Sequence, residues 1–242
     1  ICLFAAERWG FPRLAQFLRA FDDAATTDSV VRSVYRIAPE EFDREFQKFM
    51  RERFSAYLTD PKRWQELMRR GHTMLESRNW SAAREAATAA IMMLPEFTEG
   101  SSAYEVLASA EEGAGNNPAA IAALQAWRKA GGWNPAGLRK LGMLLISAKQ
   151  NAEAAEVLAA VNYADPLVVD GHDRLGQLLL ELKRGPEALR EYRVLLALQP
   201  LDTAAANFGL ARSYRLTGDQ RLARRHLLES LDTAPNFRPA QK

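Results

Sequence analysis

The sequence is poor in the residues that build metal and disulfide sites, with one cysteine and three histidines among 242 residues. A lone thiol at Cys2 excludes an internal disulfide framework and a zinc site made of several cysteines. His72, His172 and His226 are isolated in the sequence, whereas a zinc-binding helix needs two histidines one turn apart. We therefore expect no metal and no other cofactor, and we interpret the three histidines as ordinary surface or groove residues.

An excess of one charge is also missing, because 32 Lys and Arg oppose 30 Asp and Glu and leave a net charge of +2. This balance argues against a dedicated nucleic-acid surface or a polybasic membrane anchor. A local basic cluster at Arg221, Arg224 and Arg225 is interpreted as a solvated helix face, with nucleic-acid binding as a weaker hypothesis. Long apolar runs are absent too, since none approaches the roughly 20 residues of a membrane-spanning helix.

The chain begins at Ile1 without an initiator Met, and no signal-peptide pattern follows. We expect it to be a piece of a longer protein, so its compartment stays open between the bacterial cytoplasm and the cell envelope. Hydrophobic residues make up 48% of the sequence, which is enough for a packed core and excludes wholesale disorder.

Three columns of small residues or proline recur along most of the chain, with gaps of 37, 34, 34 and 35 residues in each. The first column is Gly71, Ala108, Gly142, Gly176 and Ala211; the second is Ala83, Ala120, Ala154, Ala188 and Ala223; the third is Pro95, Gly132, Pro166, Pro200 and Pro235. Small residues let paired helices approach closely, and proline cannot continue a helix interior. The shared irregular spacing indicates one helix-turn-helix unit repeated five times.

This pattern resembles the tetratricopeptide (TPR) repeat over roughly residues 64–237. It departs from that pattern at the usual Trp, where the chain has Leu67, Tyr104, Leu138, His172 and Asn207, and in the second repeat at Glu111 and Trp127. The resemblance implies an all-α fold, a right-handed α-solenoid of about five helix pairs, with repeats near 64–97, 101–134, 135–168, 169–202 and 204–237. Ser81 and Asn117 are predicted helix N-caps.

We call the first helix of each pair helix A and the second helix B. The resemblance also implies a concave groove lined by the A helices. The expected partner-facing residues of this groove are Arg69, His72, Glu76, Glu105, Ser109, Arg139, Lys140, Met143, Asp173, Arg174, Gln177, Phe208, Arg212 and Arg215. The carboxylate-clamp subclass needs paired asparagines beside its cations, and these are missing, so a chaperone-tail clamp is disfavoured. The mixed charges favour an extended or helical peptide as partner.

Residues 1–62 lack the repeat but are helical in pattern. One predicted stripe contains Leu14, Phe17, Leu18 and Phe21, and another runs from Phe42 to Phe54. At the other end, the residues after Pro235 form a short tail with no polar capping helix. This leaves the last helix as a candidate surface for self-association.

Residues 1–62 resemble the end of a peptidase-MA-like (gluzincin) domain in the order and sequence of their predicted helices. The first of these helices ends at Trp9-Gly10, and the last begins at Pro39-Glu40-Glu41. Catalysis in that family rests on His-Glu-x-x-His, which this chain lacks, so no zinc residue is carried over. We therefore predict two domains, 1–62 and 63–242, and a non-catalytic TPR scaffold that binds a protein or peptide. The alternative is the substrate-binding or tethering C-terminal part of a larger zinc metallopeptidase.

Overall fold

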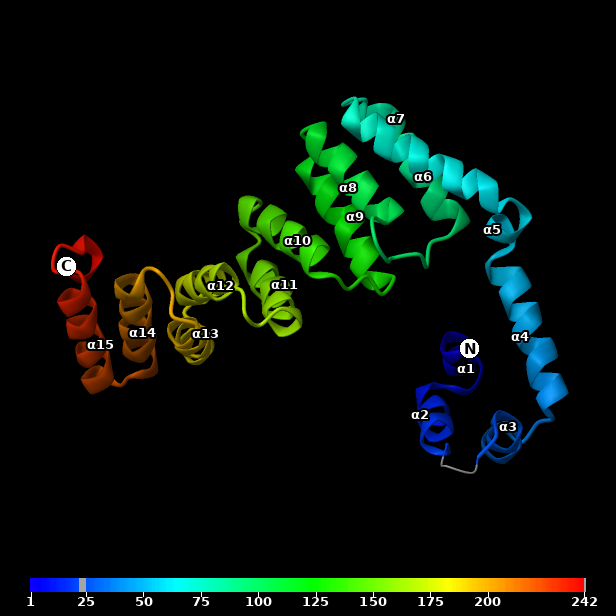
Figure 1. Cartoon of the computed structure of the whole chain (residues 1–242), viewed down its shortest axis with the longest axis horizontal. Coiled ribbons are helices and arrows are strands. Elements are labelled where there is room, and N and C mark those ends of the chain that lie inside the picture. The colour runs from blue at the N-terminus through cyan, green and yellow to red at the C-terminus, as the bar shows by residue number, and fades with distance from the viewer. Residues whose placement is uncertain (22–24, 242) are drawn as a thin grey trace. The chain divides into compact units, whose positions relative to one another are not determined.

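The computed structural model describes residues 1–21 and 25–241, and over these residues its regular structure is entirely helical (Figure 1). The chain divides into two compact units, Ile1–Leu67 with Met92–Leu94, and Met68–Ile91 with Pro95–Lys242. Helices α6 (Pro61–Glu76) and α7 (Trp80–Met93) contribute to both units.

The first unit is held together by aromatic side chains. Its helices are α1 (Cys2–Trp9), α2 (Phe11–Arg19), α3 (Thr27–Tyr35), α4 (Pro39–Arg53) and α5 (Ser55–Thr59). Phe4 is buried at the centre of this core, with ring centroids 5.3 Å from Phe42 and 5.4 Å from Trp9. Edge-on and tilted pairs of this kind add to the free energy gained from burying the rings.

The predicted stripe on α2 is only half right. Leu14 and Phe17 are buried, whereas Leu18 and Phe21 are 56% and 43% exposed. Phe21 lies beyond the end of α2 and packs edge-on against Phe17, at a centroid distance of 5.2 Å. The buried face of this short helix is therefore narrower than the apolar pattern predicted.

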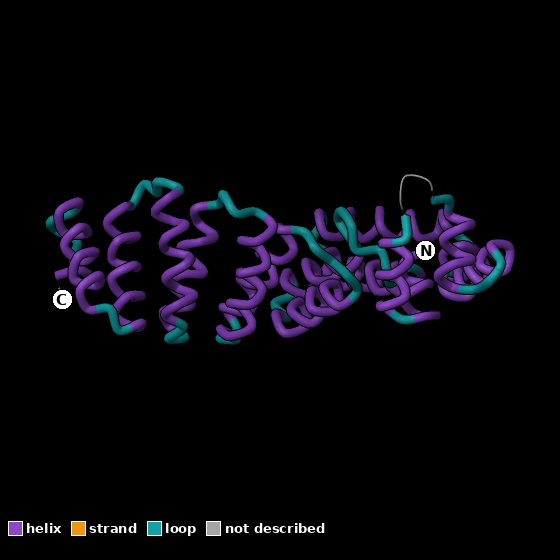
Figure 2. The backbone as a smooth tube through the Cα atoms, turned by 90° about the horizontal axis from the view of Figure 1, so that it is seen from below, coloured by secondary structure: helices purple, strands orange, loops and turns teal. Residues whose placement is uncertain are grey.

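The second unit confirms the predicted right-handed α-solenoid. Its helix pairs beyond α6 and α7 are α8 (Ala103–Gly113) with α9 (Asn117–Lys129), α10 (Pro135–Ser147) with α11 (Asn151–Ala164), α12 (Val169–Glu181) with α13 (Gly185–Ala197), and α14 (Thr203–Thr217) with α15 (Gln220–Thr233). Figure 2 shows the helices towards the C-terminus standing side by side, with the connecting loops at the two edges of the stack. The helices pack against those of the same or the adjacent repeat, as expected of repeats that bury their apolar faces by stacking.

The columns of small residues lie where helices touch. Ala83, Ala120, Ala154 and Ala188 are fully buried, and a Cβ added to Gly142 would lie 2.7 Å from Leu158 Cδ2. Such a contact leaves no room for a side chain. These columns therefore mark the points of closest helix approach, as predicted.

Trp127 explains one departure from the repeat, the glycine at position 132 where the other units have proline. The indole is fully buried, and its Nε1 donates a hydrogen bond of 2.9 Å to the Thr98 carbonyl oxygen. A Cβ on Gly132 would lie 2.2 Å from the indole ring, and one on Gly137 would lie 2.7 Å from it. The large side chain on helix B is thus accommodated by two glycines in the following turn and helix.

The turns between the A and B helices share one backbone device. Arg78, Gly115, Lys149, Lys183 and Gly218 all have φ between 56° and 87°, and they follow one another at the repeat spacing. A residue in this left-handed region commonly ends an α-helix, and glycine adopts it most easily. Three of the five turns therefore place a long cationic residue where glycine is the less strained choice.

The helix caps differ from the prediction by one or two positions. The N-cap of α9 is Asn116, whose Oδ1 accepts from the Ala119 amide, so Asn117 is already inside the helix. At the start of α7, Asn79 Oδ1 accepts from the Ala82 amide, and Ser81 lies within the helix. Because a cap must precede the first helical turn, Asn117 and Ser81 cannot serve as caps.

After α15 the chain turns back into a short 3-10 helix, Arg238–Gln241, which the expected open tail did not include. Phe237 packs edge-on against Phe208 of α14, at a centroid distance of 5.7 Å, and Ala240 is buried. The tail therefore covers part of the last repeat.

Candidate functional site

The predicted groove residues lie on the A helices α6, α8, α10, α12 and α14, and each is at least partly accessible to solvent. Their spacing along the helices places them on corresponding turns of successive repeats, because the repeats share one register. These side chains are therefore accessible from solvent, although several of them also contact one another.

Lys140 links the A helices of the second and third repeats. Its Nζ lies 2.9 Å from Ser109 Oγ, to which it donates, and 2.8 Å from a carboxylate oxygen of Glu112. Glu105, on the same helix as Ser109, accepts from the Ser102 amide in a capping box and from Asn134 Nδ2. Lys140, Ser109 and Glu105 thus hold neighbouring elements together as well as lying at the surface.

The third and fourth repeats meet through Met143 and Arg174, whose Nη1 lies 3.6 Å from the methionine sulfur. Arg139 lies 4.0 Å from a carboxylate oxygen of Asp165. Together these three predicted residues line a cavity of about 230 Å³, whose other walls include Leu158 and Val161. This cavity combines an apolar floor with two cations and the carboxylate of Asp170.

A second cavity of about 250 Å³ gathers four predicted residues, Asp173, Gln177, Phe208 and Arg212. Gln177 Nε2 donates to Asp173 Oδ2 at 2.8 Å, and the Arg212 guanidinium lies 5.9 Å from the centre of the Phe208 ring. Phe237 from the folded-back tail also lines this cavity.

The predicted residues at the two ends of the solenoid do not line either of these two cavities. Arg69, His72 and Glu76 lie on α6, whereas the residues that line these two cavities belong to α10 to α14 and to the tail. Arg215 lines a cavity of about 220 Å³ between α14 and α15, together with Arg224 from the basic cluster.

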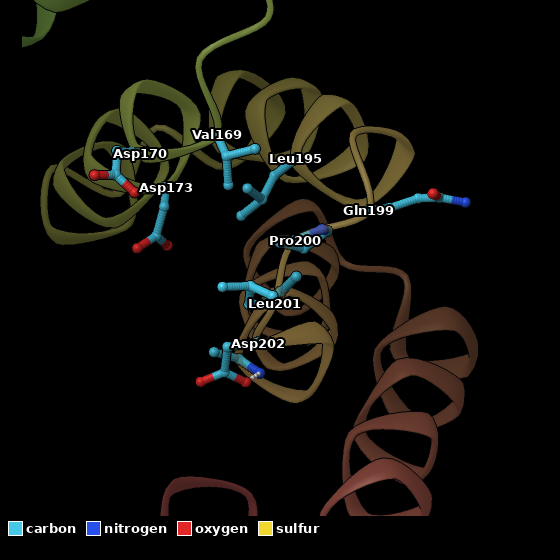
Figure 3. Close-up of a pocket in the computed structure, with 10 residues that line it drawn as sticks. Val169, Asp170, Asp173, Leu195, Gln199, Pro200, Leu201 and Asp202 are labelled. Carbon is cyan, nitrogen blue, oxygen red and sulfur yellow. Dashed lines mark hydrogen bonds between the residues drawn. The ribbon is translucent and has the colours of Figure 1, made fainter.

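A larger cavity, of about 430 Å³, lies between the starts of α12 and α14 and includes only one predicted residue, Asp173. Its walls are otherwise Val169, Asp170, Leu195, Gln199, Pro200, Leu201, Asp202, Ala205 and Ala206. Figure 3 shows the apolar side chains of Val169, Leu195 and Leu201 converging on it, with Gln199 directed away. The predicted groove did not include this cavity because the prediction covered the middle of each A helix and left out the preceding loop.

His172 corrects the interpretation of the histidines as surface or groove residues, because its ring is buried. Its Nδ1 lies 2.7 Å from Glu191 Oε2 and its Nε2 lies 2.9 Å from the Pro166 carbonyl oxygen. Asn162 Nδ2 donates to the same Glu191 oxygen at 2.9 Å. Both ring nitrogens face acceptors, so both bonds form together when the ring carries two protons.

The basic cluster on α15 is partly neutralised within its own helix. Arg225 Nε donates a hydrogen bond of 2.8 Å to Glu229, and this bond holds the pKa of Glu229 below its ordinary value. His226 Nδ1 lies 3.0 Å from Asn207 Oδ1, which ties the same helix to α14.

Within residues 1–21 and 25–241, no group of three His, Cys, Asp or Glu side chains is arranged to hold a metal ion. No helix in the same residues has the length and apolar character needed to cross a membrane.

No protein-family model matches the chain, and no curated protein matches it in sequence. Solved structures do share its fold. The crystal structure of MamA superposes with a TM-score of 0.54 and 15% identity, covering 71% of this chain and 92% of MamA. YrrB, described as a TPR protein with an unusual peptide-binding site, superposes with a TM-score of 0.55 and 16% identity, covering 71% of this chain and 86% of YrrB. At this identity the likeness shows that the chain has the TPR type of helical fold.

Proposed function

We propose that this chain is a non-catalytic TPR scaffold that binds a protein or peptide segment along its A helices. The observation that carries the proposal is the alignment of accessible, mixed-charge side chains beside apolar-floored cavities on α10, α12 and α14. These polar side chains lie outside the packed core and stay at least partly accessible, so they are available for recognition.

The cavities fit side chains of a peptide better than a small cofactor. Each is open to solvent along a helix face, and each pairs an apolar floor with a few charged groups at its edge. A peptide laid along the A helices presents side chains at regular intervals and can fill more than one of these cavities. The peptide-binding site described for YrrB, which shares the fold, supports the same class of ligand.

The test begins with selection of binding peptides from an unbiased displayed library on the complete 242-residue chain. The double variant Arg139→Glu, Lys140→Glu should weaken the selected peptides about tenfold or more, because it reverses the charge of Arg139 at the 230 Å³ cavity and of the adjacent Lys140 between α8 and α10. Arg190→Glu, on helix α13, is the matched control and should leave affinity unchanged. Circular dichroism must show equal helix content for all variants.

Equal affinity of the double variant and the wild type would place the binding surface elsewhere. Failure to select any peptide would refute peptide binding altogether. Both results can be interpreted because the charge reversals lie on accessible side chains outside the packed core.

Several finer predictions accompany this proposal. The division at residues 62 and 63, and the likeness of residues 1–62 to the end of a peptidase-MA-like domain, are predictions from sequence pattern alone. If that likeness is right, the scaffold holds substrates for, or tethers, a metallopeptidase. Self-association through α15, and nucleic-acid binding by its arginines, likewise stay predictions, which sedimentation and low-salt binding measurements respectively test.

A further inference from the structure

The cavity between the starts of α12 and α14 has an apolar floor and an acidic edge. Val169, Leu195 and Leu201 supply aliphatic walls. Ala205 and Ala206 also line the cavity, and their small side chains fill little of it. Its volume of about 430 Å³ lies within the range of about 300–1,000 Å³ that is usual for ligand sites. The floor can therefore take an apolar side chain of a partner.

Three carboxylates surround this floor. Asp170 and Asp173 lie one turn apart on α12, and Asp202 comes from the loop before α14 (Figure 3). Asp202 accepts from the Ala205 amide and Asp173 accepts from Gln177, but both of these donors are neutral. Across the described part of the chain, no Lys, Arg or His forms an ion pair with any of the three.

Carboxylates that have no direct ion pair and lie beside an apolar surface favour a cation with an apolar neighbour, because like charges repel and the cation lowers the energy of all three. We propose that this cavity binds a basic segment of a partner protein, in which a lysine or arginine meets the carboxylates of Asp170, Asp173 and Asp202 and an adjacent apolar side chain packs against Leu201. The inference rests on the proposed peptide-binding function and names the chemistry of the peptide.

The neighbouring cavity supports a fixed position for that cation. One repeat earlier, the corresponding cavity is edged by Arg139 and Arg174, and Asp170 lines both cavities. The charged residues that line the α12–α14 cavity are all acidic, whereas the earlier cavity carries two cations that repel a basic side chain. A basic residue is directed to the α12–α14 cavity and away from the α10–α12 cavity.

The experiment uses fluorescein-labelled peptides with blocked ends and the complete chain. The basic probe has the core Leu-Lys-Leu-Arg-Leu; a second probe has glutamate in place of both cations, and a third has serine in place of each leucine. Fluorescence anisotropy should show the basic probe binding at least about tenfold more tightly than either of the others.

Variants locate the site. Asp170→Asn with Asp173→Asn should weaken the basic probe roughly tenfold, as expected for two exposed charge pairs. Leu201→Ser should weaken it severalfold without changing thermal unfolding, because Leu201 is fully exposed. Asp232→Asn on α15 removes an exposed carboxylate outside this cavity and should have no effect.

Equal binding by the wild type and the double Asn variant would overturn the inference, as would a preference for the acidic probe. Free arginine or spermine binding as tightly as the peptide would overturn it in favour of a small-cation site. If the basic probe fails while library peptides still depend on Arg139 and Lys140, this inference falls and the proposed function stands. If neither binds, both fall.

Discussion

Tyr192 is held between two glycines, which makes the contact between the last repeats a sharp test of the structure. The ring belongs to α13 and is 3% exposed, and a Cβ added to Gly209 of α14 would lie 2.2 Å from Tyr192 Cε1. On the other side, a Cβ on Gly176 of α12 would lie 2.8 Å from the ring. The ring therefore cannot retreat from an added methyl group without displacing α12.

The expected cost of Gly209→Ala follows from these distances. Overpacking of a closed contact costs about 1–3 kcal/mol, and with the ring held on both sides we expect the upper end of this range. Alanine is better than glycine in a helix interior by about 1 kcal/mol, which offsets part of the cost. The net loss should be about 2 kcal/mol, or a decrease in Tm of roughly 4–8 °C for a chain of this size.

The same substitution should have the opposite sign when the ring is absent. One repeat earlier, the position of Tyr192 is occupied by Leu158 and that of Gly209 by Arg174, so a leucine on helix B leaves room for a side chain there. In a Tyr192→Leu background, Gly209→Ala should therefore stabilise the chain by up to about 1 kcal/mol. Urea unfolding followed by circular dichroism measures the four proteins, and hydrogen exchange of α12–α14 localises the effect. Equal losses in both backgrounds would refute the proposed contact.

Three further predictions concern turns, buried polar groups and pH. Lys149→Gly and Lys183→Gly should each raise the free energy of unfolding by about 0.5–1 kcal/mol, because glycine relieves the strain of the left-handed backbone at these positions. Urea titrations measure this free energy, and an unchanged value would mean that the strain is absent. His172→Phe should lower the free energy of unfolding by about 2–4 kcal/mol, because the partly buried Glu191 carboxylate and the buried Asn162 amide lose a bond; a loss below about 1 kcal/mol would contradict that network. The hydrogen bond from Arg225 lowers the pKa of Glu229 in the folded state. The pair therefore stabilises the fold above a pH of about 4.3, and this stabilisation is lost as the pH falls through the pKa of the folded state. Glu229→Gln should remove about 0.3–0.5 kcal/mol at pH 7 and progressively less as the pH falls below about 4.3, as measured by unfolding across this range.

The solenoid was predictable because its packing constraints recur in the sequence. A small residue at Gly142 or Ala154 is required wherever two helices approach closely, and five repetitions separate that requirement from chance. The exposure of the Leu18 side chain was not predictable in the same way. Whether an apolar residue such as Leu18 is buried depends on how far the neighbouring helix extends, and its own sequence does not show this. Residues 1–62 also contain no repeats that could be compared.

The burial of His172 had a usable signal in the sequence. It occupies the position where the TPR pattern has a large buried Trp, and this position outweighs the general tendency of histidine to lie on the surface. Its partners Asn162 and Glu191 come from two other helices and could be paired with it only in three dimensions. The acidic cavity was missed for a related reason, since Asp202 and Leu201 belong to a loop whose position depends on the packing of α12 against α14.

The confinement of contacts to neighbouring repeats has a consequence for how the solenoid forms and opens. Side-chain hydrogen bonds between its helices, such as those of Lys140 to Ser109 and of Arg174 to Met143, join positions 31 residues apart, within one repeat spacing. No long loop must close before native contacts form, so folding can start at any adjacent helix pair and spread in both directions. Opening should be equally graded, with α14 and α15 able to detach while α8 to α11 stay folded. A ligand seated between α12 and α14 would join two such units and should slow the exchange of amide protons in both.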